Sequence, residues 1–113
     1  MSNPNYYEKL YLCLDGYNRK FPNGNTPFHI ITRLCEEAGE LASAVNHFEN
    51  TGIKRQKHGE PDRMALAKEI QDVVRTALCV ARYYGVESEV EMAINGTYER
   101  LCEGEIDASC SYL

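Results

Sequence analysis

The chain has 113 residues, of which 43% are hydrophobic and 26% charged, and its formal net charge is −5. This length allows one domain with a hydrophobic core but not two, so we expect a single domain over residues 1–113. The net negative charge excludes non-specific nucleic-acid binding, and no apolar run is long enough to cross a membrane. The five cysteines include no C-x-x-C pair, which favours a reducing compartment. We therefore expect a cytoplasmic protein.

Apolar residues at intervals of three and four predict the first two helices. The first covers about residues 5–20 and ends at a segment rich in proline, asparagine and glycine. The second covers about residues 26–48. It begins with Thr26 as a hydroxyl cap and Pro27 at the first helical position, a combination typical of a helix start.

A loop of moderate length separates these helices from the second half of the chain. It holds two glycines, a proline and a group of basic residues, without periodicity. Asp62 can then cap a third helix over about residues 62–84, and Gly85 is well placed to end it.

A fourth helix is predicted over about residues 88–101, where Ser88 begins a match to a capping box. The remaining residues, 104–113, are expected to form a loose tail. Because no strand pattern appears, the sequence predicts an all-α, four-helix bundle-like fold.

Three carboxylates share one stripe of the helix predicted over residues 26–48. At about 100° per residue, Glu36, Glu37 and Glu40 fall within an arc of roughly 100°. Apolar residues gather on the other side of this helix: Ile31, Leu34, Ala38, Leu41 and Val45. Taken alone, the acidic stripe could be a solvated face on which Arg33 pairs with Glu36 or Glu37.

A second acidic pair, Glu69 and Asp72, lies on the helix predicted over residues 62–84. Its stripe continues with Ala65, Thr76, Cys79 and Tyr83, whereas Lys68, Gln71, Arg75 and Arg82 mark the solvent side. We read Cys79, like Cys35, as a small core residue. Partly buried carboxylates without a basic neighbour require protonation, an arginine from elsewhere or a bound cation. If the two helices pack side by side, the carboxylates converge, and oxygen ligands favour a hard ion such as Mg²⁺.

The acidic pattern as a whole points to a family. Glu36-Glu37-x-x-Glu40, followed after 28 residues by Glu69-x-x-Asp72, resembles the E-E-x-x-E…E-x-x-D signature of the MazG-like, all-α nucleoside triphosphate pyrophosphohydrolases. The resemblance implies Glu37, Glu40, Glu69 and Asp72 as Mg²⁺ ligands, with Mn²⁺ as a substitute. It implies Glu36 as the acid that shares a metal or orients the attacking water, and a metal-free Glu36 or Glu37 can act as general base.

That resemblance also implies the reaction and the assembly. The expected activity splits a ribonucleoside or deoxyribonucleoside triphosphate into the monophosphate and pyrophosphate. The expected assembly is a homodimer or homotetramer.

One departure from the family pattern concerns the residues that bind phosphate. Family members often carry a lysine and then an asparagine on the last helix, whereas no lysine follows Asp72 in this chain. The candidate substitutes for contacting substrate are Asn95, Arg100, Lys54, Arg55 and Lys57. Two alternatives therefore stay open: a phosphoribosyl-ATP pyrophosphohydrolase of histidine synthesis, and a non-catalytic helical oligomerisation or regulatory module that binds metal or nucleotide.

Overall fold

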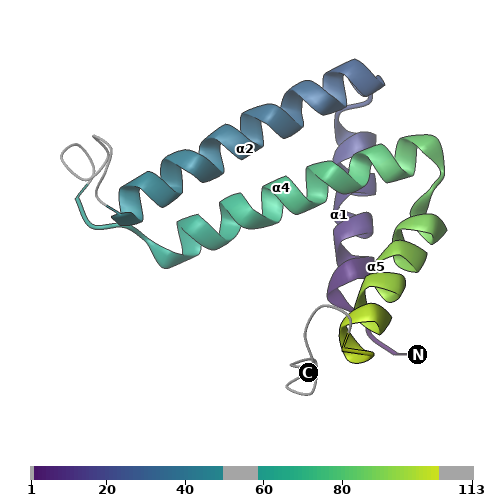
Figure 1. The fold of residues 1–113 in the computed structure, drawn as a ribbon. Coiled ribbons are helices and arrows are strands. Elements are labelled where there is room, and N and C mark those ends of the chain that lie inside the picture. The colour runs from purple at the N-terminus through teal and green to yellow at the C-terminus, as the bar shows by residue number, and fades with distance from the viewer. Residues whose placement is uncertain (1, 50–58, 105–113) are drawn as a thin grey trace. The chain divides into compact units, whose positions relative to one another are not determined.

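Four α-helices make up the part of the chain that the structure, a computed structural model, describes, namely residues 2–49 and 59–104. They are α1 (Tyr6–Lys20), α2 (Pro27–Glu49), α4 (Arg63–Tyr84) and α5 (Glu87–Cys102), drawn in Figure 1. Every boundary lies within one residue of its predicted position. No strand occurs in the described residues, and the predicted all-α fold class is confirmed.

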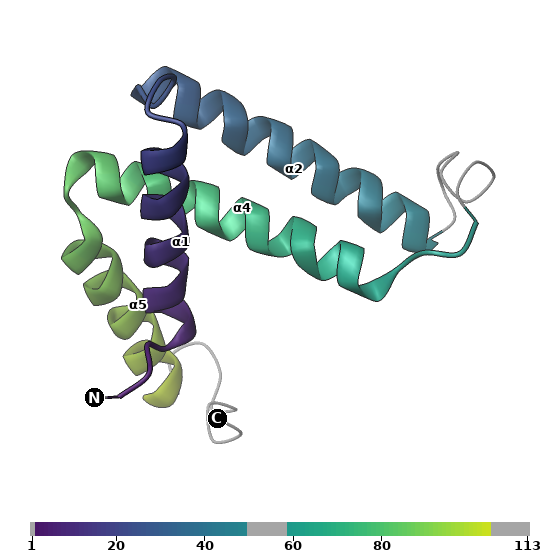
Figure 2. The same ribbon diagram turned by 180° about the vertical axis from the view of Figure 1, so that it is seen from behind.

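The chain divides into two compact units, Met1–Val80 and Ala81–Leu113. In the first unit α2 and α4 run antiparallel and side by side, with α1 lying across them, as the two opposite views show (Figure 1; Figure 2). The buried apolar residues of this unit are Tyr11, Leu14, Ile30, Leu78 and Cys79. They hold α1 against the antiparallel pair, and the single-domain expectation stays a prediction.

The beginnings of α2 and α4 carry the side-chain caps that the sequence predicts. Thr26 Oγ1 accepts a hydrogen bond from the backbone N–H of His29, with the two atoms 3.4 Å apart. Asp62 Oδ1 accepts a bond of 2.9 Å from the backbone N–H of Met64. Each cap satisfies a backbone donor that has no partner within its helix, which fixes where the two long helices begin.

In the second unit, Gly85 ends α4 as predicted, but α5 begins differently from the prediction. Gly85 has a φ of 66°, and the N–H of Val86 donates to the carbonyl oxygen of Ala81 over 2.9 Å. This pair of features is a Schellman ending, which glycine favours because it has no side chain to clash. The turn leads straight into α5 at Glu87, and Val86 makes no side-chain cap, so the capping box predicted at Ser88 is wrong.

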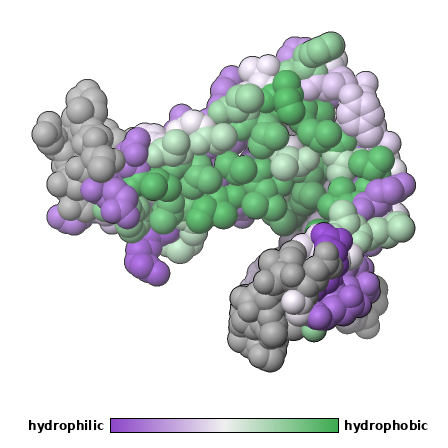
Figure 3. Space-filling model, in the orientation of Figure 1, coloured by the Kyte–Doolittle hydropathy of each residue, from purple (hydrophilic) through white to green (hydrophobic). Residues whose placement is uncertain are grey.

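Apolar side chains remain exposed along α2 and α4. Figure 3 shows hydrophobic residues gathered over these two helices. Ile31 and Val45 on α2 are 49% and 45% exposed, and Ile70 and Val74 on α4 are 47% and 42% exposed. Each pair lies on the side of its helix opposite the carboxylates. We call these four residues the α2–α4 apolar face.

The structure tests the predicted positions of two cysteines and the expectation that no segment crosses a membrane. Cys79 is buried, as predicted, whereas Cys35 is exposed, and its predicted core position is wrong. Cys35 lies at the edge between the apolar side of α2 and its acidic stripe, where no other described segment covers it. None of the described helices is both long and apolar enough to span a membrane.

Candidate metal centre

Carboxylates from α2 and α4 meet where the two antiparallel helices lie side by side. Glu37 comes from α2, and Glu69 and Asp72 come from one face of α4. One carboxylate oxygen from each of the three residues lies within 4.8 Å of the others. Two acids three residues apart share a helix face, so the local spacing places Glu69 beside Asp72, and the packing of α2 adds Glu37.

Asp72 is buried and carries two cationic neighbours from its own helix. Lys68 Nζ donates to Asp72 Oδ2 over 2.9 Å, and Arg75 Nη2 donates to Asp72 Oδ1 over 3.3 Å. The side chain of Asp72 is only 10% exposed. Lys68 is 68% exposed, as its predicted solvent-side position requires, although its ammonium reaches Asp72; Arg75 is only 17% exposed, and its predicted solvent-side position is wrong. Residues four before and three after a helical position lie beside it, and their long stems reach the carboxylate.

The charges in this group shift the pKa values of its acids in opposite directions. Burial alone would raise the pKa of Asp72, but its hydrogen bonds with Lys68 and Arg75 outweigh burial and lower it below the usual value. Burial first, and then repulsion from Asp72 and Glu69, raise the pKa of Glu37, and attraction to the two cations opposes this only in part. Three carboxylates facing two cations leave a net negative charge that disfavours an ionised Glu37.

A cavity of about 290 Å³ opens beside the carboxylates and reaches α1. Tyr17, Arg33, Glu37, Asp72 and Arg75 are among the residues that line it. The guanidinium of Arg75 stacks over the ring of Tyr17 at 4.6 Å, and its buried Nε has no hydrogen-bond partner among the described residues. The aromatic ring therefore holds Arg75 in place between α1 and Asp72.

The matched segment of the chain includes all three carboxylates. Residues 25–103 match the family model described as the MazG nucleotide pyrophosphohydrolase domain. The chain belongs to this family. It is also similar to the "Uncharacterized protein YpjD" of Bacillus subtilis (strain 168), with 36% identity over 77 residues that cover 67% of each chain. No solved structure matches the chain.

The three converging carboxylates suit the divalent metal that MazG-family proteins typically use. They offer only oxygen atoms, the ligands that Mg²⁺ prefers. Adjacent ligands of an octahedral Mg²⁺ lie about 3 Å apart and opposite ones about 4 Å apart, so atoms within 4.8 Å of one another must move closer together to share one ion. Burial, followed by the negative charges of Asp72 and Glu69, raises the pKa of Glu37, and a bound cation would compensate those charges.

Two acids of the MazG signature lie outside this close group. Glu36 and Glu40 are exposed residues of α2, and neither belongs to the set of oxygens within 4.8 Å. Glu40 lies one helical turn from Glu37, on the same stripe. Their roles as water-orienting acid and metal ligand stay predictions.

The residues predicted to contact substrate lie either in the second unit or outside the described residues, and their roles stay predictions. Asn95 and Arg100 are exposed residues of α5 in the second unit, where Arg100 donates to Thr97 Oγ1 over 3.2 Å. The predicted basic loop residues lie outside the described residues: Lys54, Arg55 and Lys57.

Sequence reasoning missed the cavity residues Tyr17 and Arg75 as parts of the site. The spacing of three residues from Asp72 was a usable signal for Arg75. Tyr17 gave no comparable signal, because only the tertiary structure brings α1 to this place. Arg33, considered as a partner of Glu36 or Glu37, instead donates to Asn25 Oδ1 over 3.1 Å.

Proposed function

We propose that this protein is a Mg²⁺-dependent nucleoside triphosphate pyrophosphohydrolase. It would convert a ribonucleoside or deoxyribonucleoside triphosphate and water into the monophosphate and pyrophosphate, with Mn²⁺ able to replace Mg²⁺. The observation that carries this proposal is the meeting of Glu37, Glu69 and Asp72 within a segment that belongs to the MazG family. Such a carboxylate group beside a lined cavity is what a polyphosphate-cleaving metal site requires.

In the proposed reaction the role of most of these carboxylates is to bind the metal. Glu37, Glu69 and Asp72 would hold Mg²⁺, and Glu40, one turn further along α2, would be a further ligand. The metal supplies positive charge that offsets the charge developing on the phosphates. Water attacks the α-phosphorus, and the bond from that atom to the α–β bridging oxygen breaks, so that pyrophosphate leaves with this oxygen.

The proton of the attacking water needs an acceptor, and this chain offers two. Glu37 can accept the proton only where its carboxylate is free of metal. Glu36, exposed on the preceding position of α2, is the acid that the family resemblance implies for orienting water. Arg33 and Arg75 line the same cavity and provide guanidinium groups suited to phosphate oxygens.

A substrate screen with matched variants tests this proposal. The wild-type protein and Mg²⁺ are incubated with ribonucleoside and deoxyribonucleoside triphosphates and with phosphoribosyl-ATP, and both pyrophosphate and monophosphate are measured. Asp72→Asn and Glu37→Gln should each lower the rate by about a hundredfold or more, because they remove metal-binding charge. Glu91→Gln, which changes an exposed acid of α5, is the control and should keep the wild-type rate.

The same screen separates the alternatives. Turnover of phosphoribosyl-ATP alone would assign the histidine-synthesis reaction. One observation favours the non-catalytic module: Lys68 and Arg75 already compensate Asp72 in the absence of metal. Failure of every triphosphate to yield pyrophosphate, or unchanged rates in both site variants, would contradict the enzymatic proposal.

We also propose that the protein is a homodimer or homotetramer that buries the α2–α4 apolar face. Four large apolar side chains exposed on two adjacent helices are costly in water, at about 25 cal/mol per Å². A second copy that covers about 800 Å² of each chain would remove this cost. Light scattering after size-exclusion chromatography should show Ile70→Glu shifted to the monomer, whereas Leu12→Glu on the exposed surface of α1 should keep the wild-type mass. A wild-type monomer would contradict this proposal.

A further inference from the structure

The ammonium of Lys68 is bound to one oxygen of the Asp72 carboxylate. Its ammonium lies 2.9 Å from Asp72 Oδ2, and its side chain is 68% exposed while that of Asp72 is 10% exposed. The ion pair therefore joins a mobile, solvent-exposed cation to a buried, fixed anion. The hydrogen bond with Asp72 raises the pKa of Lys68, and the negative charges of Asp72, Glu69 and Glu37 act in the same direction.

A divalent ion and this ammonium compete for the same place. Mg²⁺ binds carboxylate oxygens at about 2.1 Å, so an ion on Asp72 Oδ2 would lie within about 5 Å of Lys68 Nζ. Two cations at that distance repel each other, and both draw on the negative charge of the same Asp72 carboxylate. This repulsion favours metal binding with the departure of one of the two cationic partners of Asp72.

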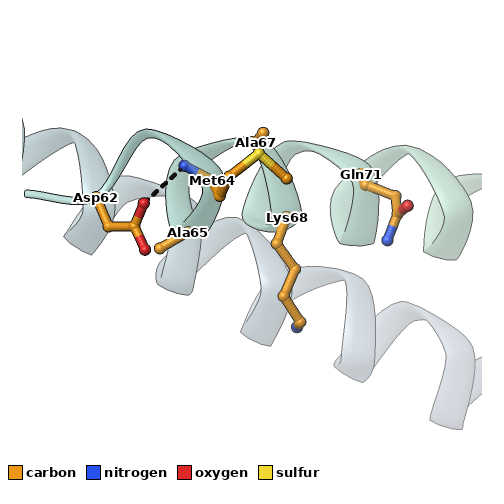
Figure 4. Close-up of a pocket in the computed structure, with 6 residues that line it drawn as sticks. All are labelled: Asp62, Met64, Ala65, Ala67, Lys68 and Gln71. Carbon is orange, nitrogen blue, oxygen red and sulfur yellow. Dashed lines mark hydrogen bonds between the residues drawn. The ribbon is translucent and has the colours of Figure 1, made fainter.

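Of the two cations, Lys68 is the one free to move. Arg75 is held by its stack over Tyr17, and its side chain is only 17% exposed. Lys68 lines a second, wider cavity of about 500 Å³ at the beginning of α4, together with Asp62, Met64, Ala65, Ala67 and Gln71. Figure 4 shows its side chain extended away from α4, toward the ribbon of the neighbouring helix in this view. A flexible four-carbon stem lets the ammonium swing into the cavity and regain water.

We propose that Lys68 is an internal counter-ion that neutralises Asp72 while the metal is absent and is displaced when a divalent cation binds. Lys68 thereby sets the concentration of divalent cation at which the site fills. The inference rests on the proposed function, since it assigns the carboxylates to a metal, but it concerns binding and not turnover.

Calorimetric titration with Mg²⁺ alone, without nucleotide, tests the displacement. Lys68→Met keeps the stem and removes the charge, so its Kd for Mg²⁺ should fall by about threefold or more relative to wild type, as expected for the loss of one exposed ion pair. Arg63→Met removes the same charge from the first turn of the same helix and should leave the Kd unchanged. An unchanged or raised Kd in Lys68→Met, an equal gain in Arg63→Met, or no Mg²⁺ binding by either protein would overturn the proposal.

Chemical labelling provides a second measurement of the displacement of Lys68 from Asp72. An amine-directed reagent should modify Lys68 faster once Mg²⁺ is added, because its ammonium is released from Asp72, while labelling of Lys9 on α1 should stay constant. A Lys68 rate that does not change with Mg²⁺ would also overturn the proposal. Failure of the enzymatic proposal looks different: pyrophosphate is absent from every assay, yet Mg²⁺ still binds and Lys68→Met still binds it more tightly.

Discussion

Replacing Glu37 with glutamine should stabilise the metal-free protein while removing its response to Mg²⁺. Two unit charges 4.8 Å apart repel by about 3.5 kcal/mol at an effective dielectric near 20. Glu37 experiences such repulsion from both Asp72 and Glu69, and attraction to Lys68 and Arg75 offsets only part of it. Because most of the repulsion is compensated, we expect a net gain of about 1 kcal/mol in the free energy of unfolding.

Thermal melts followed by circular dichroism at neutral pH provide the assay. In EDTA the melting temperature of Glu37→Gln should exceed that of wild type by about 4 °C, as 1 kcal/mol implies for a chain of 113 residues. Mg²⁺ at ten times its Kd should add about 1.4 kcal/mol to wild type by linkage and much less to the variant, which has lost a ligand. Glu91→Gln, an exposed acid of α5, should follow wild type in both conditions.

Two results would refute this reasoning. A variant that melts below wild type in EDTA would mean that Glu37 is stabilising without a metal, against the direction of its pKa shift. If Mg²⁺ raises the melting temperature of the variant as much as that of wild type, Glu37 is not a ligand of the metal.

Three further predictions concern pH and stability. Folding raises the pKa of Glu37 from 4.5, so its favourable contribution to stability is complete below pH 4.5 and is lost as the pH rises through the folded pKa. Folding lowers the pKa of Asp72 from 3.8, so its contribution to stability is present above pH 3.8 and is lost as the pH falls through the folded pKa. Urea titrations in EDTA just above pH 4.5 should therefore show wild-type stability falling with pH while that of Glu37→Gln stays level, and parallel curves would contradict the assignment. Leu14→Ala should cost about 2–5 kcal/mol in urea unfolding, because Leu14 is fully buried, and a cost below 1 kcal/mol would show that α1 does not depend on this contact. Asn5→Ala should cost about 1 kcal/mol in the same assay, because Asn5 Oδ1 accepts a 2.8 Å hydrogen bond from the backbone N–H of Glu8, and equal stability would mean that this cap is not formed in solution.

The mutual arrangement of the acids could be predicted in part from the sequence. The spacing of Glu69 and Asp72 places them on one face of any helix, and the antiparallel pairing expected of long helices brings that face near Glu37. The counter-charges could not be predicted in the same way. Lys68 and Arg75 have the spacing to reach Asp72, but the same spacing also allows both side chains to extend into water, and the choice depends on burial and on the ring of Tyr17.

The sequence by itself determined the helices, their boundaries at Thr26, Asp62 and Gly85, and the family, because caps, breaks and periodicity act over a few residues. Only the tertiary structure decided which apolar residues are covered. Periodicity identifies the apolar side of a helix, but Ile30 is buried by other segments of this chain while the α2–α4 apolar face is left exposed. Burial depends on what packs against a surface, and that is a property of the assembled helices and not of any one of them.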